Sequence, residues 1–171
     1  MSDIKYQAFI KAVTGTIEGI CTHPDDLKIF ESGGVLNVYP HQADYPKLVG
    51  AKGRTVNAIK HLFVRAAVNL NVRTAFNLEQ SFVGRREERM PFVYNPDFDV
   101  ANLLRMVEDV TAAVFSSAQV ELRINGEDIS VNIEAGRNDD NHTTAAAMNA
   151  LFYPYGFAQG RMINVKLSAI T

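Results

Sequence analysis

The stretch LVGAKGRTVNAIKHLF, residues 48–63, sets two glycines three residues apart and then begins an amphipathic helix at Arg54. Gly50 and Gly53 permit backbone conformations and close approaches that a β-carbon would block. From Arg54 onward, apolar side chains recur at helical spacing and predict one buried helix face. The first turn of a helix carries unpaired amides and the positive end of the helix dipole. The loop is therefore either an ordinary turn or a clamp for a phosphate.

Residues on both sides of this loop predict a mixed order of helices and strands. Apolar side chains at helical spacing predict a helix over residues 3–20, and LKIFESGGVLNVYP (27–40) predicts a hairpin whose strands are joined by Ser32-Gly33-Gly34. DYPKLVG (44–50) predicts one helical turn before the loop, and VRTAFNLEQ (72–80) alternates as a strand does. The order of the first half is α-β-β-α-α-β.

The same kind of order begins again after a polar stretch that contains two prolines. Residues 100–114 predict a helix, and QVELRINGEDISVNIEA (119–135) predicts a second hairpin with an Asn-Gly turn. HTTAAAMNALF (142–152) predicts a helix that ends at Pro154, and RMINVKLSA (161–169) predicts a last strand.

The two halves also align over a short span without a gap. TVNAIKHLF (55–63) lies over TAAAMNALF (144–152), an offset of 89 residues, with four identities in nine positions. The repeated element order is the stronger argument, because chance would have to reproduce a whole topology. We therefore predict an α+β fold of two αββααβ units, residues 1–80 and 98–171, joined by a linker at 81–97. Each unit is expected to be a three-stranded sheet with helices packed on one face.

The stretch GGVLNVYPHQADYPKLVGAKGRTVNAIKHLF (33–63) places G-x-K-G-R-T between the two central helices of the first unit. With this motif in this element order, the unit resembles a KH domain of type II, the prokaryotic topology, and is similar to the small bacterial KH-domain RNA-binding proteins. The family implies a GxxG loop that holds the backbone of about four nucleotides. It also implies an apolar groove for the bases, for which the candidates are Val49, Val56, Leu36 and Val38.

The resemblance implies a binding surface along one segment of the first unit. Lys52 and Arg54 add full charges beside the loop, and Lys47 and Lys60 extend its rim. The predicted nucleic-acid-binding residues are Lys47, Val49, Gly50, Ala51, Lys52, Gly53, Arg54, Val56, Asn57 and Lys60.

The second unit departs from this pattern at the position of the glycine loop, where the offset lands on DDNH (139–142). Two acidic side chains there would repel a phosphate backbone. About 27 residues (135–161) separate its strands, against 31 (41–71) in the first unit, which predicts that the short helix before the loop is truncated. We expect a degenerate KH-like unit that is kept for packing or for a protein partner.

Composition narrows the class of protein. The net charge of −2 over 171 residues counts against a generic, electrostatically driven nucleic-acid binder but allows a local basic patch. Cys21 is the single cysteine, which excludes an internal disulfide and gives no metal-ligand spacing. No apolar run approaches the roughly 18 residues of a membrane span, so we expect a cytoplasmic protein without a membrane partner.

Three further features of the sequence bear on binding. The arginines of GRREERM (84–90) are either part of a solvated linker or an accessory RNA contact. The side chains of DDNH (139–142) include types that bind a divalent ion, but no partner at useful spacing accompanies them. The aromatic cluster FYPYGF (152–157) either stacks on bases or covers a core, and we favour the core.

The sequence contains no nucleophile–base arrangement, phosphate-binding P-loop or dinucleotide fingerprint, and we expect no cofactor and no metal. We expect a non-catalytic protein that binds single-stranded RNA, with single-stranded DNA left open as a ligand. The alternative is a protein-interaction or assembly module built on the two units. In that case the second unit binds a protein partner or a second copy of the chain.

Overall fold

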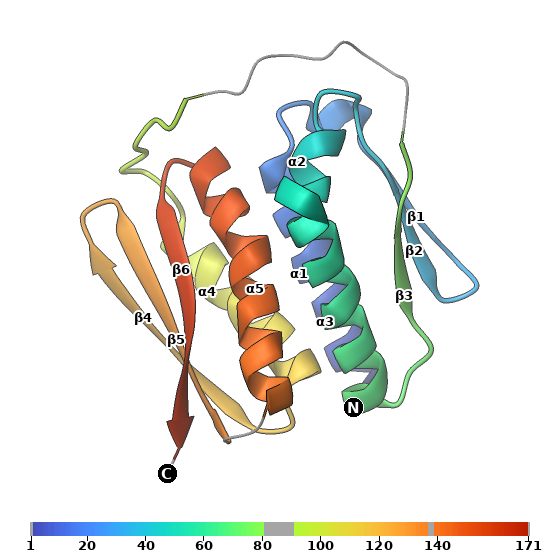
Figure 1. The fold of residues 1–171 in the computed structure, drawn as a ribbon, viewed down its shortest axis with the longest axis vertical. Helices are drawn as coiled ribbons and strands as arrows, with labels where there is room; N and C mark the ends of the chain where they lie inside the picture. Colours follow the sequence, from blue (N-terminus) through green and yellow to red (C-terminus); the bar gives the residue numbers. More distant parts are fainter. Residues whose placement is uncertain (1, 81–90, 137–138, 171) are drawn as a thin grey trace.

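The computed structural model describes residues 2–80, 91–136 and 139–170, which form two three-stranded sheets and the helices between them (Figure 1). The predicted α+β class is confirmed. The first unit follows the predicted order, with two short 3₁₀ turns at Pro24–Asp26 and Ala51–Gly53. Its helices and strands are α1 (Ser2–Ile20), β1 (Lys28–Ser32), β2 (Val35–Tyr39), α2 (Tyr45–Val49), α3 (Arg54–Leu70) and β3 (Ala75–Leu78).

The second unit repeats this order without a counterpart of α2. Strand β5 ends at Gly136 and helix α5 begins at Asp139, which leaves too little chain between them for a helical turn. The truncation predicted from the shorter strand spacing is therefore confirmed. The helices and strands of this unit are α4 (Val100–Val114), β4 (Ala118–Asn125), β5 (Asp128–Gly136), α5 (Asp139–Ala158) and β6 (Met162–Ile170).

The two sheets share one topology. In each, an antiparallel hairpin is joined by a parallel third strand beside the hairpin's second strand, which gives the orders β1-β2-β3 and β4-β5-β6. The first hairpin turns at Gly33 and Gly34, whose φ angles of +61° and +83° suit the left-handed turns that two-residue hairpins prefer. A parallel strand needs a crossover, and the helices between the second and third strands provide it in both units.

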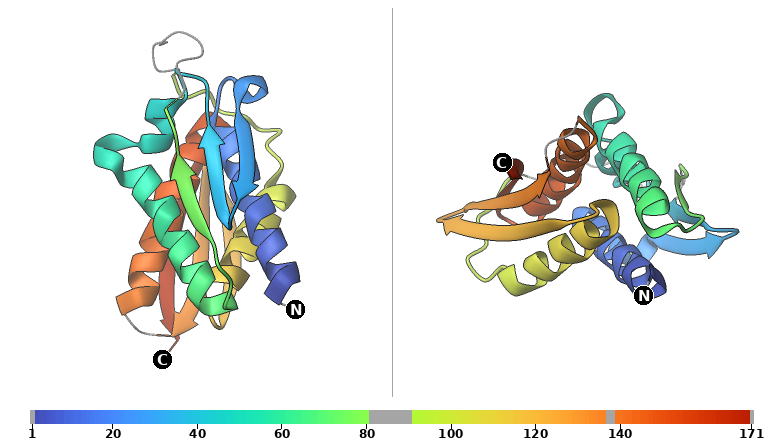
Figure 2. Two further views of the ribbon diagram at one scale, coloured as in Figure 1. Left: turned by 90° about the vertical axis from the view of Figure 1, so that its right-hand side faces the viewer. Right: turned by 90° about the horizontal axis from the view of Figure 1, so that it is seen from below.

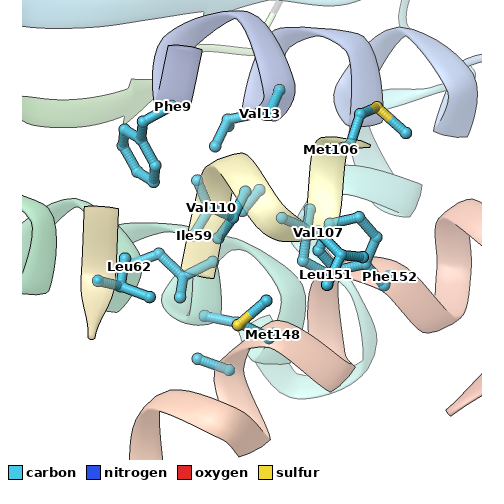
Figure 3. Close-up of a cluster of buried hydrophobic side chains, with 14 of the residues drawn as sticks. Phe9, Val13, Ile59, Leu62, Met106, Val107, Val110, Met148, Leu151 and Phe152 are labelled. Carbon is cyan, nitrogen blue, oxygen red and sulfur yellow. The ribbon is translucent and has the colours of Figure 1, made fainter. Parts of the chain in front are cut away.

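The long helices lie between the two sheets (Figures 1 and 2). Helix α1 packs on α4 and α3 packs on α5, so each helix contacts its counterpart in the other unit. Figure 3 shows side chains of these helices meeting in a hydrophobic core that includes Phe9, Ile59, Val110 and Phe152. The core is thus shared, and each unit covers helix faces of the other. None of the described helices combines the length and apolar character needed to cross a membrane.

Helices α3 and α5 pack through equivalent positions. The hydroxyl of Thr144 lies 3.2 Å from Nε2 of His61, and the hydroxyl of Thr55 donates a long hydrogen bond of 3.5 Å to the carbonyl of Ala150. At the 89-residue offset, Thr55 corresponds to Thr144 and His61 corresponds to Ala150. Each threonine therefore contacts the same position on the opposite helix, as expected of two units related by an approximate two-fold axis.

The prediction that a helix ends at Pro154 is wrong, because α5 continues through this residue to Ala158. Proline has no amide hydrogen, so the carbonyl of Ala150, four residues earlier, loses its helical partner. The Thr55 hydroxyl supplies the missing donor. Phe152 and Tyr155, on either side of the proline, are buried in the core. Tertiary packing therefore outweighs the roughly 3 kcal/mol that a proline costs in a helix interior.

Candidate nucleic-acid interface

The segment Gly50–Gly53 forms a tight turn between α2 and α3. The amide of Gly50 donates to the carbonyl of Pro46 (2.9 Å), and the amide of Gly53 donates to the carbonyl of Gly50 (3.1 Å). Gly50, Lys52 and Gly53 have φ angles of +76°, +56° and +76°. The chain thus turns through three residues of positive φ before α3 begins at Arg54. The backbone of this loop is compact and defined by its own hydrogen bonds.

Glycine is required at the two positions of the loop for different physical reasons. A β-carbon on Gly50 would lie 2.4 Å from Oγ1 and 2.7 Å from the amide nitrogen of Thr55, which no real side chain tolerates. A β-carbon on Gly53 would meet only Asn57, whose Nδ2 would lie 3.3 Å away, so here the positive φ is the main constraint. Gly50 is therefore required both by packing against the start of α3 and by its backbone conformation, and Gly53 by its backbone conformation alone.

Within the part of the chain that the structure describes, no side chain caps the amides at the start of α3. Gly53 occupies the N-cap position without a side-chain acceptor, and the first amides of a helix have no acceptor within it. The side chains of Lys52 and Arg54 are exposed beside this end of the helix. Among the described residues, no carboxylate lies within ion-pair distance of either cation. Backbone amides, a helix dipole and two full positive charges are thus available to an anion at one place.

Lys47, predicted at the rim, is engaged by Asp44. Its Nζ lies 3.2 Å from Oδ1 of Asp44, whose side chain is fully buried, and 3.1 Å from the Thr22 hydroxyl. Burial alone would raise the pKa of the Asp44 carboxyl, but hydrogen bonds from the amides of Thr22 and His23, the Thr22 hydroxyl and Lys47 bring the pKa below its ordinary value. This ionised carboxylate ties α2 to the chain that follows α1, and it reduces the charge that Lys47 can offer to a ligand.

The ten predicted residues occupy one continuous surface segment over α2, the loop and the first two turns of α3. Ala51, Lys52, Arg54, Asn57 and Lys60 are exposed. The half-buried members are Lys47, Val49, Gly50, Gly53 and Val56.

The two strand residues predicted as candidates for an apolar groove, Leu36 and Val38, are core residues. Their side chains are almost completely buried on the helix side of the first sheet, so they offer no surface to a base. A strand residue that faces a helix layer of its own unit is covered by that layer, and alternation along a strand does not reveal whether a groove opens there.

The described residues contain one group of side chains close enough to hold a metal ion: His23, His41 and Asp44, whose ligand atoms all lie within 4.8 Å of one another. The two imidazole rings are stacked, with centroids 3.9 Å apart and planes inclined by 12°. Nδ1 of His41 accepts a hydrogen bond from the Ala43 amide (3.0 Å). Because both Asp44 oxygens already accept hydrogen bonds, this group is better explained as a brace behind the loop than as a metal centre.

A pocket of about 900 Å³ opens beside the loop, between the two units. Gly50, Ala51 and Arg54 line it from the first unit. Helix α5 of the second unit lines it with Asn149 and Tyr153. The resemblance predicts a groove within the first unit, and this pocket is a different concave surface, which lies between the units.

The aromatic cluster at 152–157 divides between two roles. Phe152 and Tyr155 are buried in the shared core, the role that we favour for the cluster from its sequence. Tyr153, with 39 % of its surface exposed, and Phe157 line the pocket instead. Helical periodicity could have shown that positions 149, 153 and 157 share one face of a helix, but the predicted stop at Pro154 concealed it.

The acidic start of α5 lies far from the glycine loop. Helices α3 and α5 run in opposite directions (Figure 1), and Oδ2 of Asp140 lies 4.0 Å from Nη1 of Arg65 in the C-terminal half of α3. Eleven residues of helix separate Arg65 from Arg54, which corresponds to about 17 Å. Asp140 therefore does not face a ligand held at the loop. The arginines of GRREERM (84–90) lie outside the described residues.

Comparisons with known proteins identify a relative of about the size of one unit. No family model matches the chain, and no solved structure matches it. The RNA-binding protein KhpA of Leifsonia xyli subsp. xyli is 33% identical over 66 residues, which cover 36% of this chain and 87% of that protein. The chain therefore belongs to the family of KhpA, the KH-type family that the sequence resembles.

Proposed function

We propose that this protein binds single-stranded RNA without catalysis and holds the RNA backbone on the loop Gly50–Gly53. The geometry of the loop is the observation that carries the proposal, because uncapped amides at the start of α3 coincide with two cations that have no acidic partner among the described residues. The relative KhpA is named as an RNA-binding protein. The division into residues 1–80 and 98–171 with a linker at 81–97 is part of this proposal.

The proposed contact is electrostatic and independent of sequence. A phosphate accepts hydrogen bonds from the first amides of α3, while Lys52 and Arg54 neutralise it from either side. Each phosphate neutralised on a single strand releases counterions, so affinity falls as salt rises, with a slope of about −0.7 per contact. Single-stranded DNA carries the same phosphates and is the comparison ligand that separates a backbone contact from recognition of the ribose hydroxyl.

The test is Ala51→Asp combined with Lys52→Asp, measured by fluorescence anisotropy with a pool of random short RNAs at two salt concentrations. Both positions are exposed, and aspartate tolerates the left-handed conformation of residue 52 better than most side chains. We expect a loss of affinity of tenfold or more with an unchanged thermal midpoint. Ser117→Glu with Arg123→Glu, exposed positions at and before β4, makes the same change of net charge and should leave affinity unchanged. Equal affinity of the parent and the loop variant would remove the loop from the proposal.

The competing proposal is a protein-interaction or assembly module. Measurements on the same protein samples distinguish it from RNA binding. An apolar protein interface has a weak response to salt, whereas phosphate binding weakens steeply. Light scattering coupled to size-exclusion chromatography measures self-association directly. Salt-insensitive RNA curves together with a dimer mass would favour assembly through the second unit.

A further inference from the structure

We propose that the pocket between the glycine loop and α5 receives a base of the bound RNA, and that Tyr153 of the second unit is the surface on which this base stacks. The second unit, which lacks a glycine loop, would thereby complete the single binding site of the first. This inference rests on the proposed RNA binding of the loop. It concerns how a base is held, whereas the loop contacts only the RNA backbone.

The pocket lies directly beside the loop, so one site can hold both the phosphate and the base of a nucleotide. Gly50, Ala51 and Arg54, from the loop that would hold the phosphate, themselves line the pocket. Sugar and base follow directly from a phosphate held there, so a nucleotide bound at the loop has this pocket within its reach. The volume of about 900 Å³ falls in the range of small-molecule sites and exceeds what one base requires.

The wall formed by α5 has the chemistry that a base prefers. Tyr153 exposes 39 % of its surface although its neighbour Phe152 is fully buried. Phe157 lies one turn further along the same helix face and also lines the pocket. An aromatic face accepts any base by stacking, and the basic loop opposite attracts the phosphate to which the base is attached. The occupant that fits both walls is therefore a nucleotide of a single strand.

The repeat supports this division of roles. At the 89-residue offset, Tyr153 and Phe157 correspond to Val64 and Val68 of α3, which are exposed. The equivalent helix positions thus carry aromatic side chains on α5, where they line the pocket beside the loop, and exposed aliphatic ones on α3.

The rigidity of the second unit supports a fixed wall. Nε2 of Gln159 donates to the carbonyl of Gly19 at the end of α1 (2.7 Å), and Oδ1 of Asn149 accepts from the amide of Val165 in β6 (2.8 Å). These bonds hold the C-terminal half of α5 against the first unit and against its own sheet. Tyr153 is therefore presented from a rigid element, as a stacking surface should be.

The experiment uses the full chain. Its sequence contains no tryptophan, so any tryptophan that is introduced is the only one in the protein. Tyr153→Trp introduces a single tryptophan into the pocket, and short single-stranded RNAs are titrated while its emission is recorded. We expect the emission to be quenched as RNA binds, with affinity retained or increased. Phe30→Trp places a single tryptophan on an exposed aromatic position of β1, outside the pocket, and its emission should not change.

Tyr153→Ala provides the energetic test. We expect its affinity to be about tenfold lower, with an unchanged slope of affinity against salt, because a stacking contact is lost and no phosphate contact is. Tyr153→Phe should retain the affinity of the parent, and Phe30→Ala should leave it unchanged.

Three results separate this inference from the proposal on which it rests. Unquenched emission from the Tyr153→Trp variant together with unchanged affinity of Tyr153→Ala, in a protein whose loop variant loses RNA, would overturn the stacking site and leave the loop clamp standing. A smaller salt slope for Tyr153→Ala would also overturn it, since the tyrosine would then act through phosphate contacts. A parent protein that binds no RNA would overturn both.

Discussion

Substituting Gly50 by alanine should destabilise the protein far more than the same substitution at Gly53. Gly50 has φ +76° and ψ 170°, a backbone region that is essentially restricted to glycine and costs other residues about 1–3 kcal/mol. Its β-carbon would also stand 2.7 Å from the amide nitrogen of Thr55, which cannot move without shifting the start of α3. We therefore expect Gly50→Ala to lower the free energy of unfolding by about 3 kcal/mol or more.

Gly53→Ala is the matched control in the same loop. Gly53 lies in the ordinary left-handed region, with φ +76° and ψ 13°, and its β-carbon would meet only the end of the Asn57 side chain. Alanine in that region costs about 1–2 kcal/mol. The assay is urea unfolding followed by circular dichroism, supported by the thermal midpoint. For a chain of this length, each kcal/mol should shift that midpoint by roughly 2–4 °C.

The outcome that would refute this reasoning is an equal or smaller loss for Gly50→Ala. Such a result would mean that α3 and the loop shift at little cost, and that packing on Thr55 does not require the first glycine. If the large difference is found, RNA affinity lost in Gly50 variants cannot be attributed to a lost RNA contact. The exposed pair Ala51 and Lys52 is then the correct place to test the clamp.

Two further predictions concern the supports of the site. Asp44→Asn should lower stability at neutral pH, because the pKa of Asp44 in the folded protein lies below its ordinary value of 3.8. The stabilisation by the Asp44 carboxylate is therefore present above pH 3.8 and is lost as the pH falls through the folded pKa. Urea midpoints of parent and variant should converge in acid, and a gap that is constant with pH would contradict this. Asn69→Ala should cost about 1–2 kcal/mol, since Nδ2 of Asn69 donates to the carbonyls of Ala113 (2.9 Å) and Phe115 (3.1 Å) at the end of α4. Separate unfolding transitions for the two units in the parent would contradict the shared core on which that cost depends.

The elements were predictable wherever local pattern and tertiary structure agree. The glycine loop, the strand alternation and the helical spacing of apolar residues predict the described helices and strands, apart from the full length of α5, close to their observed positions. The repeat was visible because its units keep the same order, and the missing α2 counterpart followed from chain length alone. Pro154 was the exception, because the donor that replaces its lost hydrogen bond comes from Thr55, 95 residues from the Ala150 carbonyl that it serves.

The site was predictable on one side only. The loop residues share a short segment, so a local motif could identify them. The opposite wall belongs to a helix about 100 residues further along, and its position depends on how α3 packs on α5. No local pattern contains that packing. The same limit explains why Leu36 and Val38 are groove candidates in the sequence although both face the helices of their own unit.

The approximate two-fold relation explains how an acidic chain can present a basic site. Antiparallel packing of α3 on α5 places the start of each helix beside the later turns of the other, so the pair has two ends of equivalent geometry. At one end, Arg54 stands at the start of α3 and lines the same pocket as the aromatic face of α5, and Lys52 is exposed beside it. At the other, Asp140 stands at the start of α5 and pairs with Arg65. The two ends lie about 17 Å apart, about twice the Debye length at physiological salt, so the acidic end exerts little repulsion on a phosphate at the basic end. Net charge therefore says little about whether this protein binds nucleic acid, because the packing places the exposed cations of the loop and Asp140 at opposite ends of the α3–α5 pair.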